Sequence, residues 1–418
     1  MTALDVVVVA VAVLAFALVS RRVAGWPVTM PMVFVAFGAL TAVLGWVEVP
    51  IEAEGVALLG EVTLAVILFG DAVRIDVGAL RRELGLPARL LGIGLPLTLA
   101  LGALIGWVLL PGVGLLEAAL VAAVLTPTDA ALGQAVVEDE AVPQRVRQGL
   151  NVESGLNDGL VLPAVLLLVA LVTGAQRAPG FWIGFVVQQV GLALLVGGVV
   201  GGAGGWLVRR ALERGWIAGL YAQLATGALA VLALAGASAS GANGFIAAFV
   251  GGLVFGVVVG RDRAGHLDEY TEDTGRLLAL LTFFVFGNVF VAGVGPGLTW
   301  PVLLCAGLIL TVGRMLPVGL ALLGMRAAGP TVLFVGWFGP RGIASILFGL
   351  ILVREGIPAA EEFFEVITVT VTASVVLHGA TAAWGARRYG DWFRRTAQQR
   401  AALPEARPVT SHRLRWSR

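Results

Sequence analysis

Long apolar runs alternate with short polar clusters along almost the whole chain. Each run has roughly 20 residues, which as a helix is long enough to cross about 30 Å of membrane hydrocarbon. The pattern predicts an all-α polytopic membrane protein with about thirteen spans and no soluble domain between them. The predicted spans are residues 3–20, 28–47, 54–73, 87–110, 114–137, 149–173, 181–208, 217–235, 242–260, 276–294, 299–323, 330–352 and 362–384.

Composition supports this interpretation. Of the 418 residues, 58% are hydrophobic and only 13% are charged, whereas a soluble protein is about a quarter charged. The single cysteine, Cys305, lies inside an apolar run. A disulfide framework and a cysteine metal cluster are therefore excluded.

The basic residues predict the orientation of the spans. All 28 are arginines, and nine of them follow Trp384. If the N-terminus is outside, 24 arginines fall on the inward side and only Arg177 and Arg354 on the outward side. By the positive-inside rule the C-terminus is then cytoplasmic. We expect one transmembrane domain, residues 1–384, and a short basic cytoplasmic tail, residues 385–418, that is attracted to anionic lipid.

Ionisable side chains in mid-membrane cost about 3 kcal/mol or more each, so they are candidates for function. The candidates are Asp129, Glu153, Asp158, Arg314 and Arg341. Arg314 is expected to be a structural partner of a carboxylate or a helix end. The remaining charges lie nearer span ends or alone, where interfacial positions or local hydrogen bonds are the expected roles. These are Glu61, Glu117, His378 and Asp71, the last of which is as well suited to a site as to a boundary.

Two spans contain helix-breaking residues beside a charge. In span 5, Pro127 removes a backbone donor two residues before Asp129. In span 12, Gly339, Pro340 and Gly342 surround Arg341. We predict that both helices are broken there. Spans 5 and 12 run in opposite directions, as two inverted repeats would place them, and such paired breaks point to a transporter's binding site.

Helix geometry divides the polar residues of span 6 into two pairs. Ser154 and Asp158 share one face, and Glu153 and Asn157 share another about 100° away. Asp158 and Asp129 lie at matching depth, counted from the inner ends of their spans. Two carboxylates, a hydroxyl and exposed carbonyls predict a site for a hard monovalent cation or for protons. Glu153 is expected to pair with Arg341.

Three segments resemble the NhaP-like antiporters of the first cation/proton antiporter family, which are bacterial relatives of the sodium/hydrogen exchangers. TPTDAAL at 126–132, ESGLNDG at 153–159 and GPRGIAS at 339–345 resemble that family's motifs in spans 5, 6 and 12. Segments 68–76 and 241–256 also resemble the family. The resemblance covers nearly the whole chain.

The resemblance implies the fold and the function. It implies thirteen spans, crossed broken helices, an elevator-type ion-binding core from spans 4–6 and 11–13, and a homodimer formed through spans 1–3 and 8–10. It implies exchange of Na⁺, with Li⁺ or K⁺ as other candidates, for H⁺ across a bacterial inner membrane. A bound cofactor, an enzymatic activity and a nucleic-acid partner are not expected.

The resemblance also implies roles for individual residues. Asp129 and Asp158 are the implied ion ligands, supported by Ser154 and the Thr128 carbonyl. Glu153, Asn157 and Arg341 are the implied braces. The chain departs from the family where Ala130 follows Asp129 and where Gly70 precedes Asp71, so we include Asp71 only as a peripheral ligand.

Other functions remain open at this point. A potassium-efflux or electrogenic antiporter would have the same fold, and Asn157 in place of a second aspartate favours an electroneutral exchanger. A membrane-embedded aspartyl protease would use Asp129 and Asp158 as a dyad, but LND at 156–158 lacks the GxGD pattern of such enzymes. A channel would lack countertransport.

Overall fold

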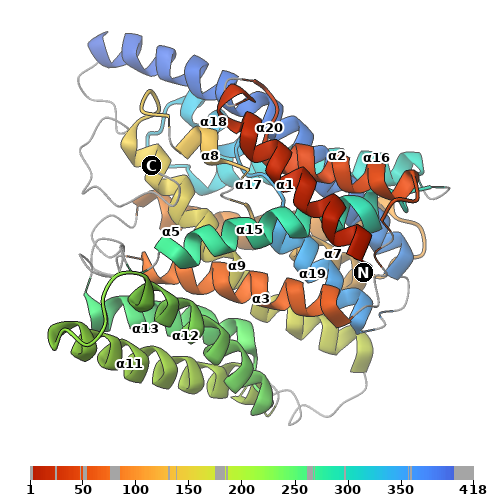
Figure 1. Ribbon diagram of the computed structural model, residues 1–418. Coiled ribbons are helices and arrows are strands. Elements are labelled where there is room, and N and C mark those ends of the chain that lie inside the picture. The colour runs from red at the N-terminus through yellow and green to blue at the C-terminus, as the bar shows by residue number, and fades with distance from the viewer. Residues whose placement is uncertain are drawn as a thin grey trace.

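The computed structural model is a bundle of helices (Figure 1). It describes residues 3–23, 26–47, 49, 54–75, 85–129, 132–137, 139–174, 184, 187–260, 267, 269–295, 298–355, 357 and 360–399. Within these ranges all regular secondary structure is helical, which confirms the predicted all-α class. The helices are α1 Ala3–Val23, α2 Met30–Val43, α3 Glu54–Val73, α5 Gly85–Arg89, the π-helix η1 Leu90–Gly94, α6 Leu95–Leu109, α7 Leu115–Leu125, α8 Gln134–Val137, α9 Gln144–Gly174, the π-helix η2 Val187–Gly191, α11 Leu192–Glu213, α12 Leu220–Ala239, α13 Gly244–Val259, α15 Glu269–Val285, the π-helix η3 Phe286–Val291, α16 Trp300–Leu310, α17 Val312–Ala321, α18 Gly329–Trp337, α19 Ile343–Arg354 and α20 Ala360–Gln399.

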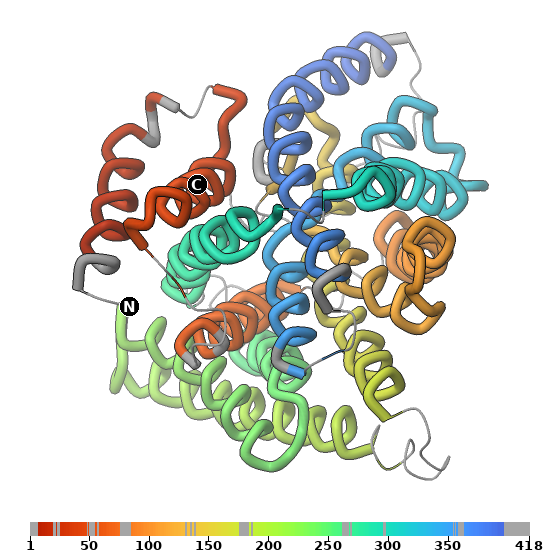
Figure 2. Tube along the Cα trace, turned by 90° about the vertical axis from the view of Figure 1, so that its right-hand side faces the viewer, coloured from red at the N-terminus to blue at the C-terminus, as the bar shows by residue number. Residues whose placement is uncertain are grey.

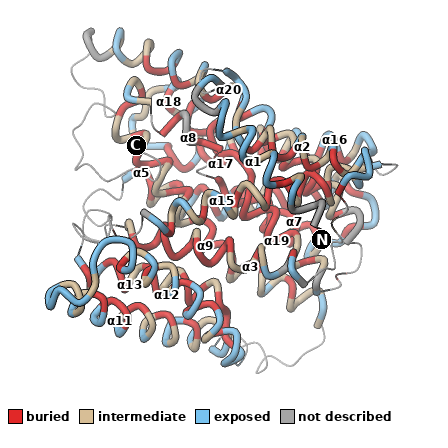
Figure 3. Tube along the Cα trace, viewed as in Figure 1, coloured by how far each residue is buried: buried red, intermediate tan, exposed pale blue. Residues whose placement is uncertain are grey.

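The helices carry the apolar length that a membrane protein needs. Among the described residues, 7 helical segments are long and apolar enough to cross a membrane, and shorter apolar helices such as α2, α7 and α13 accompany them. Exposed large apolar side chains line the outer faces of α1 and α11. Figure 3 shows the buried residues in the middle of the bundle and the exposed ones on its rim.

Helix ends follow local sequence signals. The Asn243 side chain caps α13 by accepting hydrogen bonds from the backbone N–H groups of Phe245 and Ile246. Proline stands in the first turn of α2, α16 and α18, where no backbone donor is needed. The last predicted span and the start of the predicted tail form one helix, because α20 continues through residue 385 to Gln399.

Glycines bring α11 and α13 into backbone contact at the bottom left of Figure 1. A Cβ atom on Gly197 would overlap the Ala247 carbonyl oxygen, and one on Gly201 would overlap the Gly251 carbonyl oxygen. Small residues are the usual means of close helix packing in membranes, where van der Waals contact replaces the hydrophobic effect as the driving force.

We expect Gly201→Ala to destabilise the protein by about 1–3 kcal/mol, because the added methyl group overpacks a backbone contact. Gly198→Ala is the matched control on the same helix, since a Cβ there meets no atom within 4 Å. That control should be neutral or stabilising, because alanine favours a helix more than glycine does. Thermal unfolding in detergent measures both, and equal midpoints for the two variants would contradict the packing argument.

Candidate ion-binding site

The candidate site begins where α7 ends. Pro127 has no backbone N–H, and the 126–129 segment that follows α7 lies outside regular helix. The last carbonyl groups of a helix lack partners within the helix. Here the guanidinium of Arg341 donates to the carbonyl oxygens of the two residues that follow α7, Thr126 and, at 3.2 Å, Pro127. A positive charge therefore lies at the negative end of the α7 dipole.

Asp129 lies against the start of α19. One of its carboxylate oxygens accepts a hydrogen bond from the Ile343 N–H at 2.9 Å. Its own backbone N–H donates to the Pro340 carbonyl oxygen at 2.8 Å. A side chain at Gly342 would overlap the Asp129 carboxylate, so the close approach requires glycine there. The carboxylate thus occupies the positive end of the α19 dipole.

The 126–129 and 338–342 segments therefore supply hydrogen-bond partners to each other. Arg341 of the 338–342 segment donates to carbonyl groups of the 126–129 segment. Asp129 of the 126–129 segment accepts from the first backbone N–H of α19, the helix that follows the 338–342 segment. Arg341 is fully buried and Asp129 is 8% exposed. Irregular backbone at membrane depth is tolerated where protein satisfies its polar groups, and here the two segments do so for each other.

A hydroxyl and amide cluster joins α9 to the 126–129 segment. The Asn157 amide donates to the Thr128 hydroxyl at 2.6 Å, and the Thr128 and Ser154 hydroxyl oxygens are 3.0 Å apart. Asp158 lies one turn beyond Ser154 on α9 and is buried. Ser154 and Asn157 thus contact the same threonine, although they belong to different face pairs of the helix.

Glu153 pairs with Arg314, and the predicted pairing with Arg341 is wrong. Two guanidinium nitrogens of Arg314 donate to the two Glu153 carboxylate oxygens at 2.5 and 2.7 Å. The side chains are only 2% and 1% exposed. Arg314 also packs against Gly339, where a Cβ atom would overlap the guanidinium. Arg341 instead donates hydrogen bonds to carbonyl groups of the 126–129 segment.

Asp71 lies beside the candidate site on α3. Its side chain is buried and packs against Gly155, the residue that follows Ser154 on α9. The structure therefore places Asp71 next to the helix that contributes Ser154 and Asp158. Its role as a peripheral ligand stays a prediction.

Two buried residues of α20 contact the site and were not identified from the sequence as site residues. The Arg341 backbone N–H donates to the Ser374 hydroxyl at 2.6 Å, and that hydroxyl oxygen is 3.1 Å from Nδ1 of His378. Their spacing of four residues within an apolar run was the available signal, because it places both on one helix face.

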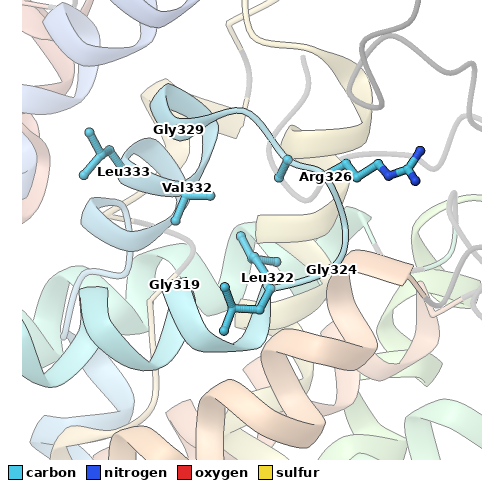
Figure 4. Close-up of a pocket in the computed structure, with 9 residues that line it drawn as sticks. Gly319, Leu322, Gly324, Arg326, Gly329, Val332 and Leu333 are labelled. Carbon is cyan, nitrogen blue, oxygen red and sulfur yellow. The ribbon is translucent and has the colours of Figure 1, made fainter.

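A cavity of about 460 Å³ lies elsewhere, at the turn between α17 and α18 (Figure 4). Leucine, valine and glycine side chains or backbone line most of it, and the Arg326 side chain points away from the space between Leu322 and Val332. None of the candidate site residues lines this cavity, so we do not connect it with ion binding.

Membrane-spanning helices that are interrupted beside buried acids are typical of secondary ion transporters. The family model described as sodium/hydrogen exchanger, transmembrane, matches residues 7–387. The chain therefore belongs to the sodium/hydrogen exchanger family. This assignment also agrees with the NhaP-like motifs of the sequence, and it gives no support to a membrane-embedded protease.

Named relatives are cation/proton antiporters. The K(+)/H(+) antiporter NhaP2 of Shewanella oneidensis is 28% identical over 341 residues, which are 79% of this chain and 57% of that protein. The K(+)/H(+) antiporter NhaP of Alkalimonas amylolytica is 25% identical over 402 residues, 94% of this chain and 67% of that protein. The chain thus spans well under the full length of these relatives.

The fold is that of a solved antiporter. The structure of the sodium proton antiporter MjNhaP1 from Methanocaldococcus jannaschii at pH 8 superposes with a TM-score of 0.72 at 20% identity. The match covers 90% of this chain and 98% of that one.

Proposed function

We propose that this protein exchanges a monovalent cation for protons, with Asp129 and Asp158 as the groups that bind them in turn. One observation carries the proposal. Two buried acids, Asp129 and Asp158, each directly follow a member of the Thr128, Ser154 and Asn157 cluster in sequence, and the first lies in the irregular segment after α7. Buried carboxylates in a membrane protein are costly, so their retention needs a task such as ion binding.

The chemistry of these groups fits exchange. Carboxylate, hydroxyl and carbonyl oxygens are ligands for hard cations. A carboxylate that accepts a proton loses the charge that attracts the cation, so the two ions compete for one site. Alternating exposure of that site to the two sides of the membrane then gives countertransport. Glu153 with Arg314, and Arg341 with the 126–129 segment, would brace the moving core.

The finer architecture is also part of the proposal. About thirteen spans would form two inverted repeats, with α7–α8 and α18–α19 as the two crossed, broken helices. Spans 4–6 and 11–13 would form an ion-binding core that moves as an elevator against spans 1–3 and 8–10, through which two copies would form a homodimer. The arginine distribution supports an external N-terminus and a cytoplasmic C-terminus in the bacterial inner membrane.

The transported cation has three candidates. We propose Na⁺ first, with Li⁺ and K⁺ as alternatives, since small carboxylate sites suit hard ions. The names of the relatives from Shewanella and Alkalimonas favour K⁺ as the second candidate, while the solved structure is that of a sodium antiporter.

The test is dequenching of a pH-sensitive dye in proteoliposomes on addition of Na⁺, Li⁺ or K⁺ in turn. We expect at least one of these salts to dissipate an imposed pH gradient, and choline chloride to leave it intact. The apparent affinity for the cation should weaken as the pH falls, because protons compete for the same carboxylates. A gradient that survives all three cations would refute the proposal.

We further predict electroneutral exchange of one cation per proton, because Asn157 takes the place of a second aspartate beside Asp158. When one cation is exchanged for one proton, no net charge crosses the membrane. The membrane potential then does no work on the exchange. A potassium diffusion potential set with valinomycin should leave Na⁺-driven exchange unchanged. A clear shift of the steady-state pH gradient with the potential would favour the electrogenic alternative.

A further inference from the structure

Ser374 and His378 lie one turn apart on the inner part of α20, which runs into the middle of the bundle (Figure 2). They are 0% and 1% exposed. The proposed exchange chemistry does not use either group. Burial of a polar side chain is costly unless it makes hydrogen bonds, so the partners of these two residues indicate their task.

The direction of each hydrogen bond follows from its partners. Nε2 of His378 is 2.9 Å from the Trp337 carbonyl oxygen, which can only accept, so Nε2 carries the hydrogen. Nδ1 is 3.1 Å from both the hydroxyl and the carbonyl oxygen of Ser374, and in the neutral ring it carries no hydrogen for the carbonyl, so it accepts the hydroxyl hydrogen. The Ser374 oxygen in turn accepts from the Arg341 backbone N–H at 2.6 Å.

These bonds attach α20 to both ends of the 338–342 segment. Trp337 is the last residue of α18, and Arg341 comes directly before Gly342, the cap of α19. Both attachments are to backbone atoms, so they fix the course of the chain. On its other side, the same stretch of backbone holds Asp129 through the Pro340 carbonyl and the Ile343 N–H.

We propose that Ser374 and His378 are positioning residues that hold the 338–342 segment, and with it the start of α19, against Asp129. The inference rests on the proposed function and adds residues that act on the ion ligand only through another segment. If this clamp is removed, Pro340 and Ile343 shift away from Asp129. A carboxylate that is no longer fixed relative to the neighbouring ligand oxygens binds the cation more weakly, so protons compete with the cation up to a higher pH.

The charged groups around the clamp lie on three elements. Arg341 belongs to the clamped segment itself, Arg314 lies on α17, and Glu153 lies on α9. Arg314 and Glu153 neutralise each other in their ion pair. None of these groups needs to titrate for the clamp to act.

The experiment compares Ser374→Ala and His378→Leu with wild-type protein in the proteoliposome assay. We expect the apparent KM for the cation to rise by about fivefold or more in each variant, with the maximal rate within about twofold of wild type. The pH at which exchange is half-maximal should move to higher values. Ser374→Thr, which keeps a hydroxyl at this position, should restore both quantities.

Thr381→Val is the matched control. Thr381 lies one turn from His378 on α20 and accepts a hydrogen bond from the indole N–H of Trp337 at 3.0 Å. Its hydroxyl contacts the indole of the same tryptophan and otherwise donates to carbonyl oxygens within α20, those of Leu377 and His378, and not to the backbone of the 338–342 segment. We therefore expect its KM and pH profile to match wild type, and an equal shift in this variant would overturn the proposal.

Hydrogen–deuterium exchange of the purified full-length protein tests the clamp without transport. Peptides that cover 338–346 should take up deuterium faster in both variants, because the Arg341 amide loses its acceptor in Ser374→Ala and the Trp337 carbonyl loses its donor in His378→Leu. Peptides from α13 should not change. Unchanged deuterium uptake at 338–346 would overturn the clamp. If the wild type transports ions and its variants keep the wild-type KM, the positioning role is overturned. If the wild type does not transport ions but the variants show the expected deuterium uptake, only the proposed function is refuted.

Discussion

Asp158→Asn is expected to reduce cation-driven exchange in proteoliposomes to the background of protein-free liposomes. The substitution keeps the size of the side chain and removes the negative charge, so neither a cation nor a titratable proton is held there. Folding should be preserved, because asparagine still makes hydrogen bonds. Dye dequenching measures the loss, and the elution volume from size exclusion checks that the variant is intact.

The structure indicates that Asp129→Asn should likewise remove the charge without disturbing the local fold. The Ile343 N–H that meets the Asp129 carboxylate can still donate to an asparagine carbonyl oxygen, so the helix start keeps its cap. We expect nearly as severe a loss of exchange as for Asp158→Asn. Asp273→Asn is the matched control, since that side chain is 65% exposed, and it should be as active as wild type. Wild-type rates in both site variants would remove these carboxylates from the mechanism.

Breaking the Glu153–Arg314 pair is expected to have the largest effect on stability. Removing one partner of a buried, two-bond ion pair leaves the other charge uncompensated, which typically costs about 3–5 kcal/mol. Glu153→Gln and Arg314→Gln should therefore each lower the midpoint of thermal unfolding strongly. The double variant should cost clearly less than the sum of the single variants.

Two controls make this comparison of single and double variants specific to the Glu153–Arg314 pair. Asp391→Asn breaks an exposed ion pair with Arg394 and should change stability by at most about 1 kcal/mol. Glu153→Gln combined with Arg341→Gln should show a smaller coupling energy than the Glu153 and Arg314 variants, because Glu153 and Arg341 are hydrogen-bonded to different partners. Strict additivity of the Glu153 and Arg314 variants would mean that the pair contributes no coupling energy.

The positions of the helices could be predicted from the sequence, because the length and hydropathy of an apolar run are enough to indicate a membrane-spanning helix. Proline and glycine likewise marked the places where α7 and α18 end. The three π-helical turns in the described part of the chain could not be predicted, because an inserted residue is accommodated by packing between helices and leaves no local pattern.

The partner of Glu153 was mispredicted for a physical reason. The pairing was inferred because Glu153 lies off the face of Ser154 and Asp158, and because no other mid-membrane acid was left for Arg341. That inference did not consider that a buried arginine can be satisfied by backbone carbonyl groups, as Arg341 is at the interruption after α7. Arg314 and Arg341 were both available as mid-membrane cations, and only the three-dimensional packing assigns one to Glu153 and the other to the carbonyl groups after α7.

His378 shows the same limit from another side. A single histidine in an apolar run predicts local hydrogen bonding, and it does contact Ser374 four residues earlier. Its second contact, to the Trp337 carbonyl oxygen, comes from a segment 41 residues away in the sequence. No pattern within one span predicts such a contact.

The length of α20 has a practical consequence for imaging. Its 40 residues rise about 1.5 Å each, so the helix is about 60 Å long, roughly twice the thickness of the hydrocarbon layer. At its far end Gly390 packs against Ala141, and the Tyr389 and Thr331 hydroxyl groups are hydrogen-bonded. A marker protein fused in helical register after Gln399 would be rigidly joined to this helix, and would serve as a fiducial for particle alignment that reports the tilt of α20 in each image.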